Sequence, residues 1–173
     1  MRRIFLLLVV ALALTGCSTT IKYSDVVPPA TQKLERGQAI FIALPADGMF
    51  ETKTYPGSGY QTATFLSKHL TPYAKSATIA TTVDDTPTAL AKAKESGATY
   101  AFIPVIVLWE PRVAAWSGRP TRAGIVIAIH DAQTGQHLMT ERIDIQGRTM
   151  TFVSQHVDSL VDRGIQDLCP KLF

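Results

Sequence analysis

Hydrophobic residues after position 38 recur at strand spacing and then at helix spacing. Residues 39–44 form a short apolar run that ends at Pro45, which predicts a strand. Residues 58–70 carry apolar side chains at helical spacing, with Ser58 as the expected cap and Pro72 as the stop. The face of this helix that should be buried contains Ala63, Leu66 and Leu70.

A second strand and a second helix follow. Residues 77–83 alternate between apolar and polar side chains, as a half-exposed strand does. The helix after them is expected to be capped by Asp85 or Thr86, with Pro87 in its first turn and Gly97 just past its end.

Two nearly continuous apolar runs, residues 99–109 and 124–130, predict strands that are covered on both faces. Pro104 lies inside the first run and should interrupt the strand pairing or mark a bulge. Residues 131–135 are typical of a hairpin turn, in which Gly135 supplies a positive φ.

The chain closes with a returning strand over residues 137–146 and a helix over residues 151–168, which Pro170 should end. From residue 38 the predicted order is βαβαβββα. We therefore expect an α+β layered domain, with a mixed sheet and helices on both faces. The first two helices should cover one face and the last helix the other. The apolar positions of the last helix are Phe152, Val153, Val157, Leu160, Val161, Ile165 and Leu168.

The amino terminus has the features of an export signal. Two arginines precede residues 4–14, an apolar run that is shorter than the roughly 20 residues needed to span a bilayer. Leu14-Thr15-Gly16-Cys17 then resembles the lipobox of bacterial lipoproteins. The resemblance implies that residues 1–16 are removed, that Cys17 carries a diacylglyceryl thioether and that its new amino group is acylated. An ordinary secretory signal with an incidental Cys17, or a buried core helix, are the alternatives.

The residue after the lipobox bears on location. In lipoproteins a serine at this position usually accompanies sorting to the outer membrane, so Ser18 favours a lipid-anchored, periplasm-facing place there over the inner membrane. Residues 17–37 are polar, contain two consecutive prolines and predict a flexible tether. Residues 38–173 then have the size of one periplasmic domain.

Charge and cysteine content exclude some functions. The 17 basic and 14 acidic residues become 15 and 14 once Arg2 and Arg3 are removed with the signal, a net charge of +1. The basic residues form no stripe, so no nucleic-acid partner is indicated. With Cys17 lipidated, Cys169 has no partner in the chain and is expected to be a shielded thiol, while a disulfide between two chains is the alternative.

An ordered set of residues carries a family resemblance. It consists of residues 100–109, Glu110-Pro111-Arg112, Ala115-Trp116-Ser117-Gly118 and residues 127–135. The set resembles the bacterial lipoproteins grouped as domain of unknown function 4823, across nearly the whole mature chain. That family implies no mechanism. More loosely, the order of elements is similar to the amino-terminal domain of TolB and to the curli-secretion lipoprotein CsgG.

Candidate catalytic and metal sites are weak. Gly57-Ser58-Gly59 lacks the Lys-Ser/Thr that follows in a phosphate loop and is two residues short of the Gly-x-Ser-x-Gly of a serine nucleophile turn, and a helix cap explains it. His130 and His137 flank the hairpin turn and should meet across the strands, but a zinc site needs three or four ligands. His69 and His156 are expected on helices. We predict no catalytic residue, no metal and no cofactor.

The segment from Trp109 to Arg122 holds the strongest candidate binding residues. Tryptophan and arginine are frequent anchors of interfaces, and an indole can stack on a sugar ring. The structural alternative is that the tryptophans close the core and that the arginines pair with Glu110 or Asp144. The candidate partner-binding residues are Trp109, Arg112, Trp116, Arg119 and Arg122.

The sequence thus predicts a non-enzymatic lipoprotein that binds or assembles with another envelope component, either an envelope protein or peptidoglycan. A periplasmic hydrolase using Ser58 or the His130/His137 pair is one alternative, and a subunit of a secretion or envelope-assembly complex is another. Ordered, solvent-facing tryptophan and arginine side chains would favour binding. A cleft that joins Ser58 to a histidine would favour the enzyme.

Overall fold

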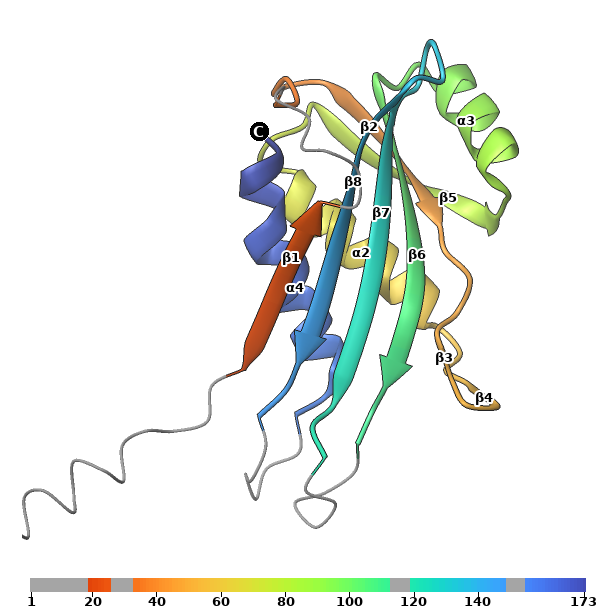
Figure 1. Ribbon diagram of the computed structural model, residues 1–173. Coiled ribbons are helices and arrows are strands. Elements are labelled where there is room, and N and C mark those ends of the chain that lie inside the picture. Colours follow the sequence, from red (N-terminus) through yellow and green to blue (C-terminus); the bar gives the residue numbers. More distant parts are fainter. Residues whose placement is uncertain (1–18, 26–32, 113–118, 149–154) are drawn as a thin grey trace, which may run out of the picture.

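The computed structural model describes residues 19–25, 33–112, 119–148 and 155–173. Within them, six strands form one mixed sheet in the order β1-β8-β7-β6-β2-β5, and β3 pairs with β4 apart from it (Figure 1). The strands are β1 (Thr20–Asp25), β2 (Ala39–Leu44), β3 (Met49–Phe50), β4 (Lys53–Thr54), β5 (Ser76–Val83), β6 (Tyr100–Glu110), β7 (Arg122–Asp131) and β8 (His137–Gln146). The helices are α2 (Ser58–Leu70), α3 (Thr86–Glu95) and α4 (Val157–Leu172).

The predicted α+β class and the succession βαβαβββα are confirmed once β1, β3 and β4 are set aside. The hairpin between β7 and β8 also forms as expected, because Gly135 adopts φ 76°. Its N–H donates to the carbonyl oxygen of Asp131 at 2.9 Å, which closes the turn.

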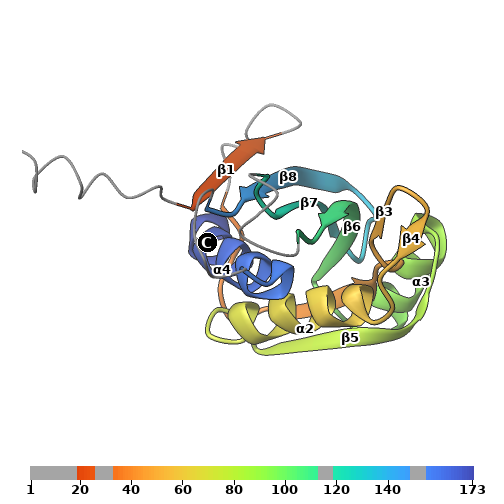
Figure 2. The ribbon, with the colours of Figure 1, turned by 90° about the horizontal axis from the view of Figure 1, so that it is seen from below.

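The helices cover both faces of the sheet, but not in the expected grouping. α2 and α4 lie side by side on one face, joined by the ion pair of Lys68 with Asp162, and α3 covers the other face alone (Figure 2). The connection from β2 to β5 steps outward and the connection from β5 to β6 steps back across β2. Right-handed crossovers in opposite directions place α2 and α3 on opposite faces. The expectation that the last helix would stand alone was wrong for this reason.

The amino-terminal segment is not simply a tether. Thr20–Asp25 forms the edge strand β1, which pairs with β8 along its whole length. Tyr23 holds β1 against α4, since its hydroxyl donates to the Gly164 carbonyl at 3.2 Å and Lys171 lies over its ring. Burial raises the pKa of Tyr23 to about 12. Leu34 is also buried. The prediction of a flexible tether over residues 17–37 is therefore corrected for these residues.

β6 is covered on both faces only in its first half. Ala101 and Ile103 pack under α3, whereas Val105 and Val107 are 52% and 46% exposed. Pro104 neither interrupts the pairing nor marks the bulge, which falls between Ile106 and Leu108. Pairing with β2 ends at Phe102, so Pro104 lies where a missing N–H is tolerated at the strand edge.

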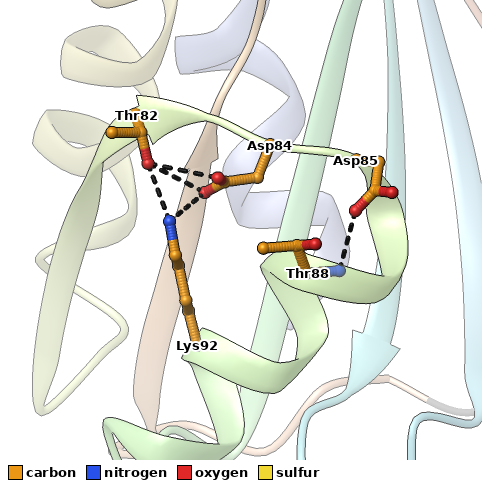
Figure 3. A network of polar contacts seen from close by, with 5 residues as sticks. All are labelled: Thr82, Asp84, Asp85, Thr88 and Lys92. Atoms are coloured by element: carbon orange, nitrogen blue, oxygen red, sulfur yellow. Dashed lines mark hydrogen bonds and ion pairs between the residues drawn. The ribbon is translucent and has the colours of Figure 1, made fainter.

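The amino-terminal caps of α2 and α3 differ in how far they match the prediction. Asp85 caps α3 as predicted: its carboxylate accepts the N–H of Thr88 at 2.9 Å, and this bonding lowers the pKa of Asp85 (Figure 3). Figure 3 also shows Lys92 tied to Thr82 and Asp84 at the end of β5. For α2, the cap position is Gly57 at φ 88° and not Ser58, which is a correction to the sequence prediction.

The last helix runs through Pro170 to Leu172, although Pro170 was expected to end it. A proline so close to the end removes little of the helix's hydrogen bonding, which explains its tolerance. Cys169 is fully buried, and burial raises the pKa of its thiol to about 12. The prediction of a shielded thiol is confirmed. Phe152 and Val153 lie outside the described residues. Among those described, no helix is long and apolar enough to cross a membrane.

Candidate functional site

A cleft of about 620 Å³ lies at the end of the sheet where β6 stops and α2 and α4 begin. Its volume is within the range of small-ligand and peptide-segment sites. Apolar walls alternate with amide, imidazole and charged groups around it. The lining residues are Tyr55, Pro56, Ser58, Gln61, Trp109, Pro111, Arg112, Gln155, His156, Val157 and Asp158.

Trp109 forms the floor of this cleft and is not a surface anchor. Its side chain belongs to the large hydrophobic core and is only 2% exposed. Gly48 permits this packing, because a Cβ at that position would lie 2.6 Å from the Cβ of Trp109. For Trp109 the structural alternative, in which the indole closes the core, is the one that the structure supports.

Two of the predicted binding arginines are occupied by one buried carboxylate. Glu110 is 1% exposed and accepts from Nε of Arg112 at 2.7 Å and from Nε of Arg122 at 2.8 Å. The guanidinium of Arg112 also stacks over the ring of Phe50. Charge-assisted contacts of this kind join the end of β6 to the start of β7. Asp144 pairs with Arg142 instead, at 2.8 Å.

A chain of hydrogen bonds holds Gln155, which lines the cleft. Thr121 donates its hydroxyl to the Gln155 carbonyl at 3.2 Å, and Gln155 accepts the N–H of Arg148 at 2.6 Å through Oε1. The amide nitrogen of Gln155 donates to Oγ1 of Thr19 at 3.3 Å. The first described residue of the chain is therefore tied directly to a residue that lines the cleft.

Ser58 and His156 line the same cleft, which is the arrangement that the hydrolase alternative required. The Ser58 hydroxyl, however, accepts the N–H of Gly48 at 2.8 Å and donates to the Tyr55 carbonyl at 2.7 Å. Both contacts join the β3–β4 segment to the start of α2. A nucleophilic serine needs its hydroxyl proton directed at a base, whereas this proton is directed at a backbone carbonyl.

His130 and His137 meet across the hairpin as predicted, with ring centroids 5.2 Å apart. Each ring also has a local partner, since Nδ1 of His130 lies 3.3 Å from the Gly135 carbonyl and Nε2 of His137 lies 2.7 Å from Oγ1 of Thr140. No group of three metal-ligating side chains occurs in the described ranges. The remaining predicted anchors are Arg119, which is exposed, and Trp116, which lies outside the described residues.

Sequence reasoning missed most of the cleft. Tyr55, Gln61, Gln155 and Asp158 come from three separate segments, and each is an ordinary surface residue type. The pattern marked the ends of β6 and α2, but it carried no information on how closely α4 begins beside them. The sequence analysis singled out the end of β6 as a candidate binding region and Ser58 as a candidate for the hydrolase alternative, and no other part of the cleft.

Comparisons with known proteins agree with this fold. A family model described as domain of unknown function (DUF4823) matches residues 32–172, and a model of the prokaryotic membrane lipoprotein lipid attachment site matches residues 1–18. Among curated protein sequences, none matches the chain.

Solved structures show the same architecture. The PelC dodecamer from Paraburkholderia phytofirmans has a TM-score of 0.65 at 18% identity, covering 89% of this chain and 97% of that one. Protein XCC0632 from Xanthomonas campestris has a TM-score of 0.53 at 8% identity, covering 84% and 87%. TolB from Acinetobacter baumannii matches with a TM-score of only 0.32 at 11% identity, covering 87% of this chain and 29% of TolB. The first two likenesses show the fold.

Proposed function

The chain belongs to the family described as domain of unknown function 4823, and we propose that it is a lipid-anchored binding protein of the outer membrane's periplasmic face. Its cleft between β6, α2 and α4 receives a segment of another envelope protein. The observation that carries this proposal is the cleft itself, which combines apolar walls with several polar groups at the anchored end of the domain.

The chemistry of the cleft favours a protein segment over a sugar. Trp109 offers almost no exposed ring face for stacking, and one face of Tyr55 is already occupied by Lys53. Proline and tyrosine walls with glutamine amides suit an extended backbone, whose N–H and C=O groups need hydrogen-bonding partners. Gln61 and Asp158, which line the cleft, supply such partners.

The cleft can be tested by crosslinking in intact cells. A photoreactive residue at Gln61, which lines the cleft, should capture a defined envelope protein. The same residue at Thr64, exposed on the same helix, should not. Gln61→Trp should fill the cleft and weaken capture at least about tenfold, because hot-spot contacts contribute about 2 kcal/mol or more. Equal capture from both positions would contradict the proposal, and muropeptide adducts at Gln61 would replace it with peptidoglycan binding.

The anchor makes a separate prediction. Cys17→Ser should abolish acylation and leave an unprocessed or soluble product, because the lipid is the proposed membrane attachment and two or more acyl chains are needed for stable anchoring. Membrane fractionation after a high-salt wash, together with mass spectrometry of the amino-terminal peptide, measures this. If Cys17→Ser stays with the outer membrane after the wash, the proposed anchor is wrong.

Self-assembly is a second candidate role. The similar PelC structure is a dodecamer, and this chain leaves Val105 and Val107 exposed on the face of β6 beyond α3. If that face joins copies, the detergent-solubilised lipoprotein should sediment as an oligomer, and Val105→Lys should shift it to the mass of a single chain. A single-chain mass for the unaltered protein would exclude this role.

A further inference from the structure

One end of the sheet gathers the start of the ordered chain, the cleft and several arginines. The pairing places Thr20 opposite Gln146, Gln146 opposite Arg122, and Arg122 opposite Glu110, so these four residues form one row across β1, β8, β7 and β6. Figure 2 shows these four strands side by side in that order. Neighbouring strands lie about 4.8 Å apart, so the row is roughly 15 Å wide. The cleft and the described residues directly after β6 and β8, Pro111, Arg112, Gly147 and Arg148, lie at this same end.

The proposed lipid anchor lies very close to this row. Thr19 is bonded to Gln155 at the cleft wall, and Cys17 precedes Thr19 by two residues. Two residues span at most about 7 Å even when fully extended. The acyl chains of Cys17 enter the bilayer. The membrane surface must therefore lie close to Thr19 and to Gln155, the lining residue that Thr19 contacts. This step rests on the proposed anchor at Cys17.

The same end carries an excess of positive charge. Arg119 and Arg148 are exposed, and Arg122 is half-exposed although it pairs with Glu110. Among the described residues, the acidic groups near this end are Glu110, which is buried between two arginines, Asp158 at the cleft, Asp47, which accepts the N–H of Gly59, and Asp144, which pairs with Arg142. On the β3–β4 turn, Glu51 and Lys53 carry opposite charges.

We propose that Arg119, Arg122 and Arg148 dock this end of the domain on anionic phospholipid headgroups of the leaflet that holds the anchor. Guanidinium groups bind phosphate with two parallel hydrogen bonds. In the docked state the guanidinium groups contact the headgroups, well within the Debye length of about 8–10 Å at physiological salt, so the attraction is not screened away.

Docking gives the domain a fixed orientation. β1 is paired with β8 over six residues, so the domain cannot swing freely about a long linker. The cleft then faces the membrane surface, and its ligand is a segment presented there. On a flexible tether, the domain would instead sample many orientations relative to the membrane.

The test uses the full lipidated protein in vesicles. A fluorophore on Gln146→Cys reports the anchored end, and one on Gln136→Cys reports the far end of β8, roughly 30 Å away at about 3.3 Å per residue. Buried Cys169 stays unlabelled in the folded protein. In vesicles of phosphatidylethanolamine and phosphatidylglycerol with a headgroup nitroxide quencher, Gln146→Cys should be quenched several-fold more than Gln136→Cys. The difference in quenching between the two labels should shrink in vesicles of phosphatidylcholine, which carry no net charge. It should also shrink in 1 M KCl, where the Debye length falls to about 3 Å.

Charge reversal provides the matched variants. Arg119→Glu/Arg148→Glu should lower the ratio of docked to undocked protein by at least about 25-fold, since losing each arginine near an anionic surface costs about fivefold and each new glutamate adds repulsion. Lys75→Glu/Lys94→Glu, at exposed positions away from this end, should leave the ratio unchanged. Thermal melts must show that both pairs fold. Vesicle flotation with equal quenching at the two labels, or an unchanged ratio in the arginine pair, would overturn the docking. Loss of flotation in the unaltered protein would overturn the anchor at Cys17 itself.

Discussion

Arg112→Met/Arg122→Met should lower the free energy of unfolding by about 3–5 kcal/mol, since it leaves a buried carboxylate without its charged partners. Glu110 is 1% exposed, and the two arginines are its ionic contacts in the described chain. A typical domain has only about 5–15 kcal/mol of total stability, so the loss would be conspicuous. Urea unfolding of the detergent-solubilised lipoprotein, followed by circular dichroism, measures it.

Two controls separate burial from the mere loss of an ion pair. Adding Glu110→Met to the double variant should recover most of the lost stability, because a well-packed apolar residue replaces the stranded charge. Arg142→Met removes the exposed pair with Asp144, in which both side chains are about two-fifths exposed, and should cost no more than about 1 kcal/mol. A double variant as stable as Arg142→Met would show that Glu110 is not held by these arginines.

This network explains why the segment from Trp109 to Arg122 was only partly interpretable from sequence. Tryptophans and arginines flanked by prolines are typical of binding loops, and the same residues can equally close a core and neutralise a buried acid. Deciding between the two required the burial of Glu110, which depends on contacts between β6 and β7. Arg119 was predicted to bind a partner and is now proposed to contact the membrane, whereas Trp109 and Arg112 line the cleft.

The fold was more predictable than the site because local patterns determine its elements. Asp85, Pro87 and Gly97 mark α3 in sequence, and the alternation of residues 137–146 marks β8. The grouping of helices was not predictable from these signals, because it follows from the placement of β2 between β5 and β6. β1 was missed for a similar reason: a six-residue edge strand with polar neighbours becomes recognisable only when Tyr23 has Gly164 and Lys171 to pack against.

The glycines around Ser58 illustrate how one motif can serve two physical purposes. Gly57 adopts φ 88° and has no atom within 4 Å of an added Cβ, so it supplies backbone conformation. Gly59 supplies space: an added Cβ would lie 2.2 Å from the Pro45 carbonyl oxygen. Its N–H also donates to the Asp47 carboxylate at 2.9 Å. The motif pattern argued against a phosphate loop and a catalytic turn, but sequence alone could not show that one glycine supplies conformation and the other supplies space.

Gly59→Ala should therefore be the most damaging small substitution at the cleft. Overpacking against rigid backbone costs about 1–3 kcal/mol, and losing the charge-assisted bond to Asp47 adds about 1.5–3 kcal/mol. The start of α2 must move away from β2, carrying Ser58 and Gln61 with it, so capture of a partner through Gln61 should fall together with stability. Gly57→Ala should cost only the left-handed penalty of about 1–2 kcal/mol, and Gly57→Asn less, because asparagine tolerates this conformation. Denaturant unfolding and crosslinking of the three variants rank them by loss of stability and of partner capture. If Gly57→Ala lowers the free energy of unfolding as much as Gly59→Ala or more, the close packing of α2 on Pro45 is contradicted.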